Sequence, residues 1–213
     1  MGDEVERLPL FPLGIVLLPE EVVPLHIFEE RYKTMITECL EEGREFGIVW
    51  LAPDGLREIG CTAEIAQLLE RMEDGRMNIL VRGTRPFRLV ERIEDMPYPA
   101  GDVEMLDDES SAESERDQLA AQARERYADL VEQLTDSRPD ETGLEELGAY
   151  GMASTIDFAP ELKQDLLEAR SESERLRMVG ELFVSTMRRL EFVERTSEQA
   201  RSNGHIKPSS LGP

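Results

Sequence analysis

The sequence predicts an α+β fold, in which a small, curved, barrel-like β domain with one packed helix is followed by a helical bundle. In the first half, short apolar runs with β-branched residues alternate with prolines and turn signals, which is typical of strands. In the second half, apolar residues recur three and four positions apart, which is the period of helices. We therefore expect a β-rich subdomain over residues 1–107, a helical subdomain over 108–196 and a disordered tail over 197–213.

The most apolar stretch covers residues 8–32 and contains Pro9, Pro12, Pro19 and Pro24. Proline fixes φ and lacks a backbone N–H, so no long helix can run through this stretch. We expect short buried strands or extended arms here, each ended by a proline. Beyond the last proline the apolar spacing becomes helical, which predicts a helix over residues 29–42 with Gly43 as its C-cap.

Four strands are predicted after this helix, and Asp74-Gly75 predicts a hairpin between the second and third of them. The alternation of apolar and polar residues weakens at residues 67–69, which indicates a β-bulge. Thr84-Arg85-Pro86 is expected to end the third of these strands and to separate it from the last one. Regular short strands of this kind favour a closed or strongly curved sheet. The expected strands cover residues 46–51, 57–70, 77–83 and 87–93.

Four helices are expected after residue 108. Ser110 with Glu113, and Ser171 with Glu174, have the spacing of a capping box, so they predict the starts of the first and last helices. Pro160 suits the first position of a helix. The first helix is expected to end at residues 137–140, and the others to span 143–154, 160–169 and 171–195.

The remaining polar groups show no clear site. We interpret the acidic run 104–109 as a solvated linker, because a metal site needs convergent ligands that a bare run does not supply. Cys39 and Cys61 lack metal-type spacing and are expected to be buried thiols of a reducing compartment, with a disulfide between them left open. His26 is expected to be satisfied by a backbone carbonyl, with a role as a functional base as the alternative.

The charge balance argues against a nucleic-acid partner. The chain has 24 Lys and Arg against 46 Asp and Glu, a net charge of −22. Phosphate binding needs a concentrated basic surface, and the densest arginine cluster, within residues 82–92, is flanked by Glu91 and Glu94. The apolar runs are too short to cross a bilayer, and the acidic amino terminus does not fit a secretory signal. We expect a cytoplasmic protein without a membrane partner.

Several blocks occur in the order of a known domain. They are LPLFPLG, LLPEEVVPLHIFEERYKTMI, FGIVWL, REIGCTAEIAQLLERMEDGRMNILVRGTRPFRLVE and LKQDLLEARSESERLRMVGELF. Over residues 8–195 the chain resembles the amino-terminal, substrate-binding domain of Lon proteases. The resemblance implies a PUA-like β domain and a module that binds unfolded or flexible polypeptide clients by apolar contacts, or that docks onto a dedicated protein partner.

The resemblance also implies an ATPase module and a Ser-Lys protease module after this domain, and neither is expected here. No Gly-Lys-Ser/Thr occurs, so there is no phosphate-binding loop. A serine–lysine site needs the lysine aimed at an exposed hydroxyl, and Lys163 has no such partner in a recognisable motif. Ser154 and Ser171 are interpreted as a helix-end residue and a cap. We expect a protein that is not an enzyme, with no catalytic residue, metal or cofactor.

Five residues are candidates for polypeptide binding: Phe28, Tyr32, Met35, Met72 and Met77. The two methionines flanking the predicted hairpin turn suit promiscuous apolar contacts, because methionine is flexible and polarizable. The other three, or the apolar stripe over residues 176–190, would line a groove between sheet and helices, but the favoured interpretation is that they are simply core. For the two methionines, packing inward on the sheet stays open as the alternative.

Two other functions remain as alternatives. The β part of this family is similar to small barrels that bind RNA, and an RNA-binding PUA-like barrel predicts a basic face and a steep salt dependence. A small-molecule-binding regulatory protein predicts a pocket with a carboxylate of shifted pKa.

Overall fold

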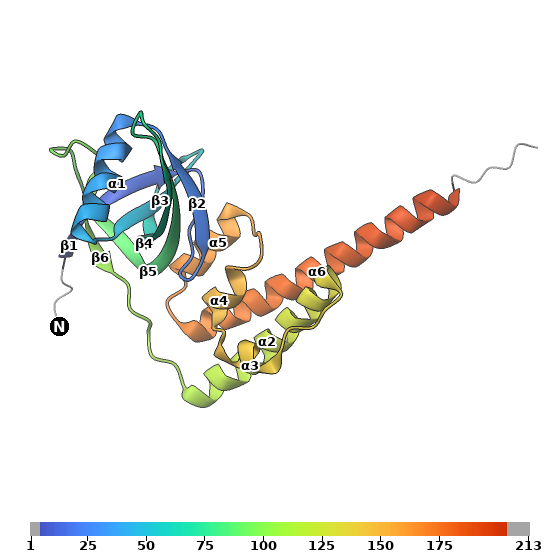
Figure 1. Ribbon diagram of the computed structural model, residues 1–213. Helices are drawn as coiled ribbons and strands as arrows, with labels where there is room; N and C mark the ends of the chain where they lie inside the picture. Colours follow the sequence, from blue (N-terminus) through green and yellow to red (C-terminus); the bar gives the residue numbers. More distant parts are fainter. Residues whose placement is uncertain (1–4, 204–213) are drawn as a thin grey trace, which may run out of the picture.

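The strands form one six-stranded sheet that closes into a barrel. In the computed structural model, which describes residues 5–203, the strand order is β2-β5-β4-β3-β1-β6, and β5 also pairs with β6 (Figure 1). That extra pairing closes a ring of β1, β3, β4, β5 and β6, while β2 extends the sheet beside the first part of β5. The α+β expectation is confirmed. The strands are β1 Val5–Leu13, β2 Val22–Ile27, β3 Phe46–Ala52, β4 Gly55–Arg71, β5 Met77–Ile93 and β6 Ala100–Met105.

β5 runs without a break through Thr84-Arg85-Pro86, so the expected interruption there is wrong. Its first part pairs with β2 and its last part with β6. Opposite residues 84–86 the pairing with β4 shifts register. There the Thr62 hydroxyl lies 2.6 Å from the Thr84 hydroxyl and accepts the Arg85 N–H at 3.0 Å. The Thr62 side chain thus takes the place of a backbone hydrogen-bond partner at this point. β5 therefore bends here and does not end.

β6 was missed by the sequence analysis, which placed the start of a solvated linker at Glu104. β6 lies between β1 and β5 and buries Val103 inside the barrel. Its acidic neighbours point outward, where Asp102 pairs with Arg7 at 3.0 Å and Glu104 with Arg88 at 3.5 Å. The acidic composition therefore reflects one solvated face of a strand.

The prolines also behave differently from the expectation. Pro9 and Pro12 lie within β1, and Pro24 lies within β2, so these prolines do not end their strands. β2 pairs only with β5 in the described part of the chain, which is the edge position that tolerates proline.

A small core fills the barrel and is centred on Phe87, which is fully buried with Leu8, Leu10, Val49 and Val103. Two glycines face this ring. A Cβ at Gly47 would lie 2.6 Å from Phe87 Cζ, and a Cβ at Gly60 would lie 2.7 Å from it. These glycines are therefore required by the close approach of the strands to the ring.

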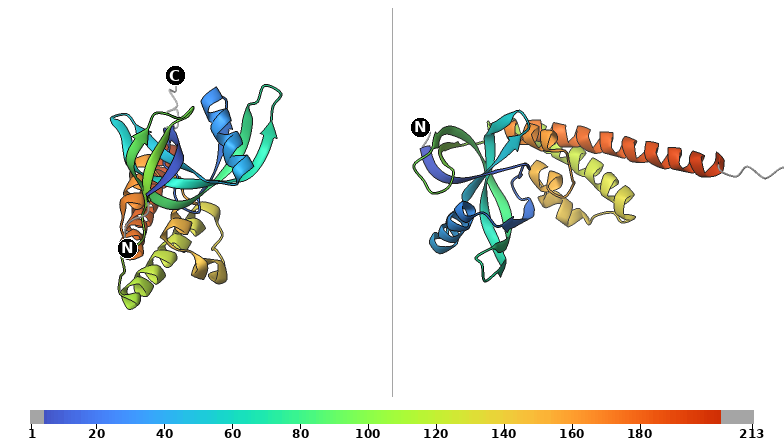
Figure 2. Two further views of the ribbon diagram at one scale, coloured as in Figure 1. Left: turned by 90° about the vertical axis from the view of Figure 1, so that its left-hand side faces the viewer. Right: turned by 90° about the horizontal axis from the view of Figure 1, so that it is seen from above.

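The helix α1 (Glu30–Glu42) covers the outside of the sheet next to the β4–β5 hairpin, which projects beyond the barrel (Figure 2). Its buried face carries Met35, Ile36 and Cys39. The helix ends at Gly43, whose φ of 64° is left-handed, as the C-cap prediction required.

The second half is helical. α2 and α6 lie side by side, and α6 continues well past the end of α2 (Figure 1). None of the helices described over residues 5–203 combines the length and the apolar character that a membrane span requires. The helices are α2 Glu113–Thr135, α3 Glu141–Glu146, α4 Ala149–Ala153, α5 Pro160–Glu168 and α6 Glu172–Asn203.

Three details differ from the helix predictions. The N-cap of α2 is Ala112, without a side-chain cap, so the capping box at Ser110 is wrong. The single helix expected over 143–154 is divided into α3 and α4 by Leu147-Gly148. The tail was expected to be disordered from residue 197, whereas α6 continues to Asn203. Residues 204–213 lie outside the described part of the chain.

The helical part is held against the β part by a buried ion pair. Lys163 of α5 lies 2.5 Å from the carboxylate of Glu21, in the segment between β1 and β2. The other carboxylate oxygen of Glu21 accepts the Leu18 N–H at 2.9 Å. Beside this pair, the Gln164 amide donates to the Ile59 carbonyl of β4 at 3.1 Å. α5 is therefore the helix that docks on the barrel.

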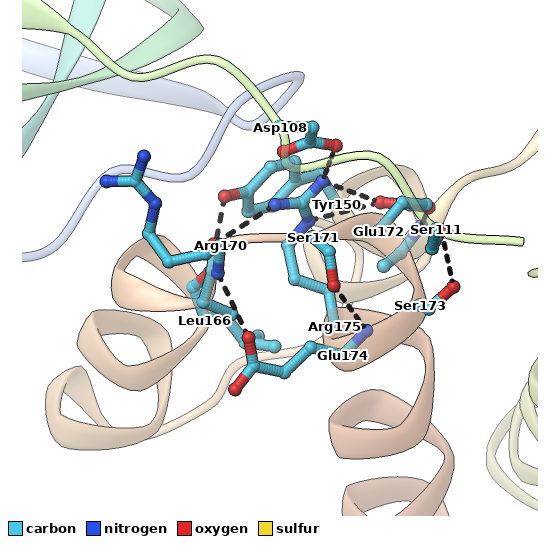
Figure 3. A network of polar contacts seen from close by, with 12 residues as sticks. Asp108, Ser111, Tyr150, Leu166, Arg170, Ser171, Glu172, Ser173, Glu174 and Arg175 are labelled. Atoms are coloured by element: carbon cyan, nitrogen blue, oxygen red, sulfur yellow. Dashed lines mark hydrogen bonds and ion pairs between the residues drawn. The ribbon is translucent and has the colours of Figure 1, made fainter.

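A second junction is centred on Arg175 of α6 (Figure 3). Its buried guanidinium bonds Asp108, pairs with Glu172 at 3.0 Å and lies over the Tyr150 ring at 4.5 Å. The Tyr150 hydroxyl donates to the Leu166 carbonyl at 3.2 Å. Arg175 and Tyr150 together thus tie the segment after β6 to α4, α5 and α6.

Candidate functional site

The five candidate residues do not form one surface. Phe28 is 60% exposed and Tyr32 lies buried near it. Met35 and Met77 are 0% and 1% exposed, because the helical and strand periods turn both toward the core between α1 and the sheet. Met72 is half-buried beside the hairpin turn. Of the five, only Phe28 and Tyr32 line a common hollow, and Met35, Met72 and Met77 do not contribute to it.

That hollow is an open groove of about 530 Å³ at the mouth of the barrel. Its floor is an aromatic pair, Phe11 and Tyr32, with ring centroids 4.1 Å apart. Phe28 stands at the end of β2, and Leu51 and Leu56 come from the β3–β4 hairpin. Leu51 is 53% exposed, so large apolar side chains from two elements reach solvent around one groove.

A second hollow of about 440 Å³ continues the first. It is bounded by Met96 and Pro97 of the β5–β6 loop. The two hollows share lining residues and together form one trough, which we call the barrel-mouth groove. The shared residues are Pro12, Arg31, Leu56, Arg92 and Pro99.

The charged groups of the groove differ in how they are paired. Arg31 lies over the Tyr32 ring at 4.6 Å and pairs with Glu29 at 2.8 Å. Burial raises the pKa of the Tyr32 phenol, so the floor stays uncharged. Arg92 is exposed and forms no ion pair with any residue in the range 5–203.

His26, at the edge of the groove, has a different partner from the one expected. Its Nδ1 lies 2.7 Å from Asn78 Oδ1, and the Asn78 amide nitrogen donates to Glu70 at 3.0 Å. Because the carboxylate only accepts, it fixes the Asn78 amide, and His26 Nδ1 must donate. The ring stacks beside Phe28, with centroids 5.9 Å apart. The histidine is thus held by side chains and no backbone carbonyl is involved.

The open edges of the sheet are poor sites for adding a further strand. In β2, Pro24 lacks the backbone N–H that a neighbouring strand would need. In the outer part of β4 the register shifts twice, at Ala66 and Leu69, which confirms the expected bulge near residues 67–69. Prolines and bulges both discourage edge pairing. A ligand of this protein is therefore better accommodated by side-chain contacts in the groove.

Other chemistry-bearing residues are occupied or scattered. Ser171 caps α6, with its hydroxyl accepting the Glu174 N–H at 3.3 Å, and Ser154 ends α4, as expected. Cys39 and Cys61 are buried free thiols, and burial raises the pKa of each. Within residues 5–203 no group of three or more His, Cys, Asp or Glu side chains is placed to hold a metal ion.

Sequence reasoning missed most of the groove. Leu51 ends a predicted strand and Leu56 falls between two predicted strands, and the exposure of both depends on where the barrel ends. The consecutive apolar residues of β3 were the available signal, since Trp50 and Leu51 cannot both face the core of a strand.

Comparison with known proteins identifies relatives of this arrangement. A family model described as the ATP-dependent protease La (LON) substrate-binding domain matches residues 7–185. Lon protease of Paraburkholderia phytofirmans is 25% identical over 92% of this chain and 26% of its own length. Lon protease 2 of Myxococcus xanthus is 27% identical over 84% of this chain and 24% of its own length. The chain thus spans about a quarter of these curated relatives.

Two solved structures share the fold. A Lon N-terminal domain protein from Xanthomonas campestris superposes with a TM-score of 0.61 at 24% identity, covering 82% of this chain and 96% of that one. The N-terminal domain of a Mycobacterium avium complex Lon protease gives 0.66 at 18% identity, covering 84% and 98%. At these identities the likeness concerns the fold.

Proposed function

Because the chain belongs to the LON substrate-binding domain family, as its ordered sequence blocks predicted, we propose that it binds unfolded or flexible polypeptide segments in the barrel-mouth groove and does not cleave them. The observation that carries this proposal is the exposure of Phe28 and Leu51 around one apolar trough. Large apolar side chains held in solvent around a hollow are typical of a site that another molecule covers.

The shape of the groove favours a flexible chain as its ligand. It is open to solvent along its length, with aromatic and aliphatic residues on the floor and walls. A folded protein buries its apolar side chains, whereas an unfolded one can insert them into such a trough. Met96, at the far end, adds a side chain that adapts to different ligands.

The state of Lys163 supports a role without catalysis. Its ammonium group is buried and paired with Glu21, whereas a serine–lysine dyad needs the lysine at a serine hydroxyl. Cys39 and Cys61, both free, suit a reducing compartment, so we propose a cytoplasmic location.

The arginine cluster supports RNA binding less well than the groove supports polypeptide binding. Arg82 pairs with Glu64 at 2.7 Å, Arg85 with Asp107 at 3.2 Å, and Arg88 with Glu104. Three of the four arginines are thus neutralised by carboxylates, and a phosphate would have to displace them.

The proposal is tested by fluorescence anisotropy with a labelled, permanently unfolded polypeptide, the same polypeptide in its folded form, and single-stranded RNA. We expect saturable binding to the unfolded form alone. Phe28→Ser and Leu51→Ser should each weaken it about tenfold, because exposed aromatic and aliphatic anchors carry much of an interface's energy.

Phe192→Ser is the matched control, since Phe192 is 70% exposed on α6, away from the groove. Equal losses for Phe28→Ser and Phe192→Ser would contradict the groove assignment. Tight RNA binding with a steep salt dependence would favour the alternative function. Binding to none of the three ligands would point to a dedicated protein partner instead.

A further inference from the structure

We propose that Arg92 makes the barrel-mouth groove selective for segments in which an acidic residue lies next to apolar ones. This inference rests on the proposed function and adds a ligand class to it. The acidic group would contact the guanidinium while its apolar neighbours occupy the space around Phe28 and Leu56.

Arg92 lies near the end of β5 and lines both hollows of the groove, so it stands where they meet. Its cross-strand neighbour on β6 is Gly101, which has no side chain to shield or pair with it. The guanidinium is therefore available to a ligand that runs along the groove.

Arg92 also lacks a carboxylate partner among the described residues, although acidic residues outnumber basic ones about two to one in this chain. In the described residues up to Met105, every arginine forms an ion pair except Arg71 and Arg92. Arg71 lies at the outer end of β4, away from the groove, whereas Arg92 lies inside it.

The other charged residues of the groove determine whether it prefers an acidic or a basic residue in the ligand. Glu29 neutralises Arg31, so that pair offers little to a ligand. Glu94 lines only the hollow next to Met96, where it would repel a second acidic residue. Arg92 is thus the cation at the centre of the groove that no carboxylate of the described residues neutralises. The N–H donors of its planar guanidinium can bind both oxygens of a ligand carboxylate.

Apolar surroundings make this contact selective. A charge-assisted hydrogen bond among partly desolvated groups contributes more than one in water. The chain as a whole repels acidic ligands through its net charge of −22. A preference for an acidic residue would therefore have to come from a local cation such as Arg92.

The test uses three labelled peptides with the same phenylalanine- and leucine-rich sequence and a central Glu, Gln or Lys. We expect the full chain to bind the Glu peptide about tenfold more tightly than the Gln peptide, and the Lys peptide most weakly. Arg92→Gln should abolish the difference between Glu and Gln, and Arg92→Glu should reverse the order in favour of Lys. Arg71→Gln, which removes an equally unpaired charge elsewhere, should leave the order unchanged.

The outcomes separate this inference from the proposed function. Equal binding of all three peptides by the wild type, lost in Phe28→Ser, overturns the role of Arg92 and leaves the groove assignment standing. A Glu preference that persists in Arg92→Gln also overturns it. Binding of none of the peptides overturns both, provided that circular dichroism shows each variant to be folded.

Discussion

Glu20 lies where the β part meets the helical part and has an unusual backbone, with a φ of 67°. Such left-handed conformations are uncommon outside glycine and cost about 1 kcal/mol or more. Its carboxylate approaches α4, since a Cβ added at Gly151 would lie 2.8 Å from Glu20 Oε2. Partial burial and the charge of Glu172 raise its pKa, while Arg82 lowers it.

This raised pKa makes stability depend on pH in a defined direction. The folded state keeps the Glu20 proton to a higher pH than the unfolded state, whose pKa is near 4.5. The cost of ionisation is therefore absent below the unfolded pKa and grows as pH rises through the folded pKa. Glu20→Gln should stabilise the protein at neutral pH and have little effect well below pH 4.5. Urea unfolding at both pH values checks this, and a pH-independent difference would exclude the mechanism.

At the scale of single elements, Phe87 holds the barrel together. It fills the interior against two glycines that leave room for its ring. Phe87→Ala should cost about 3–5 kcal/mol of unfolding free energy, because the rigid strands cannot collapse into the cavity. Phe28→Ala, at an exposed position, should change stability by about 0.5 kcal/mol or less. Chemical denaturation of both variants makes the comparison, and similar losses would show that Phe87 is not the centre of a core.

Pro24 lies at the free edge of β2, where it removes a backbone N–H that another strand could pair with. Replacing it by threonine restores a backbone N–H and a strand-forming residue at that edge. Pro24→Thr should increase concentration-dependent self-association, measured by sedimentation velocity. Val22→Thr, on the same strand with the proline kept, is the control. An unchanged association state of Pro24→Thr would mean that the proline does not protect the edge.

The elements that sequence predicted well are those with local signals. Gly43 ends α1, Pro160 begins α5, and Ser171 caps α6, and each depends on a few neighbouring residues. β6 was missed because its stability comes from pairing with β1 and with the end of β5, far away in the sequence. Without that pairing in view, the acidic residues of β6 are typical of a linker.

The candidate site was predictable only in part, for the same reason. Phe28 was identified as one of three apolar residues at helical spacing that would line a groove, but its exposure could not be known. Met35 and Met77 fit a binding surface by residue type, yet the packing of α1 on the sheet buries them. Leu51 and Arg92 enter the groove only once the barrel closes. The closing of the barrel places these residues together. No pattern among neighbouring residues of the sequence predicts that closing.

At the scale of the whole molecule, the buried pair of Glu21 and Lys163 joins the two halves. Lys163→Met would leave a buried carboxylate without its partner and should cost about 3–5 kcal/mol. Adding Glu21→Gln should recover most of that loss, because the amide oxygen can still accept the Leu18 N–H. Thermal unfolding of the single and double variants tests this prediction. A single variant as stable as the wild type would show that the pair does not hold α5 to the barrel.

The whole-molecule arrangement leaves the groove unobstructed. α5 docks on β4 through Lys163 and Gln164, whereas the groove lies at the mouth of the barrel between the end of β2 and the β3–β4 hairpin. The helical part thus supports the barrel without supplying lining residues to the groove. We expect the groove to remain accessible when the helical part is bound elsewhere.

Photo-cross-linking tests whether the unfolded polypeptide lies in the barrel-mouth groove. A benzoylphenylalanine would replace Phe28 in one variant and Phe192 in another, each irradiated with the same unfolded polypeptide. We expect strong cross-linking from position 28, competed by unlabelled polypeptide, and little from position 192. Cross-linking from position 192 alone, or equally from both, would contradict the groove assignment.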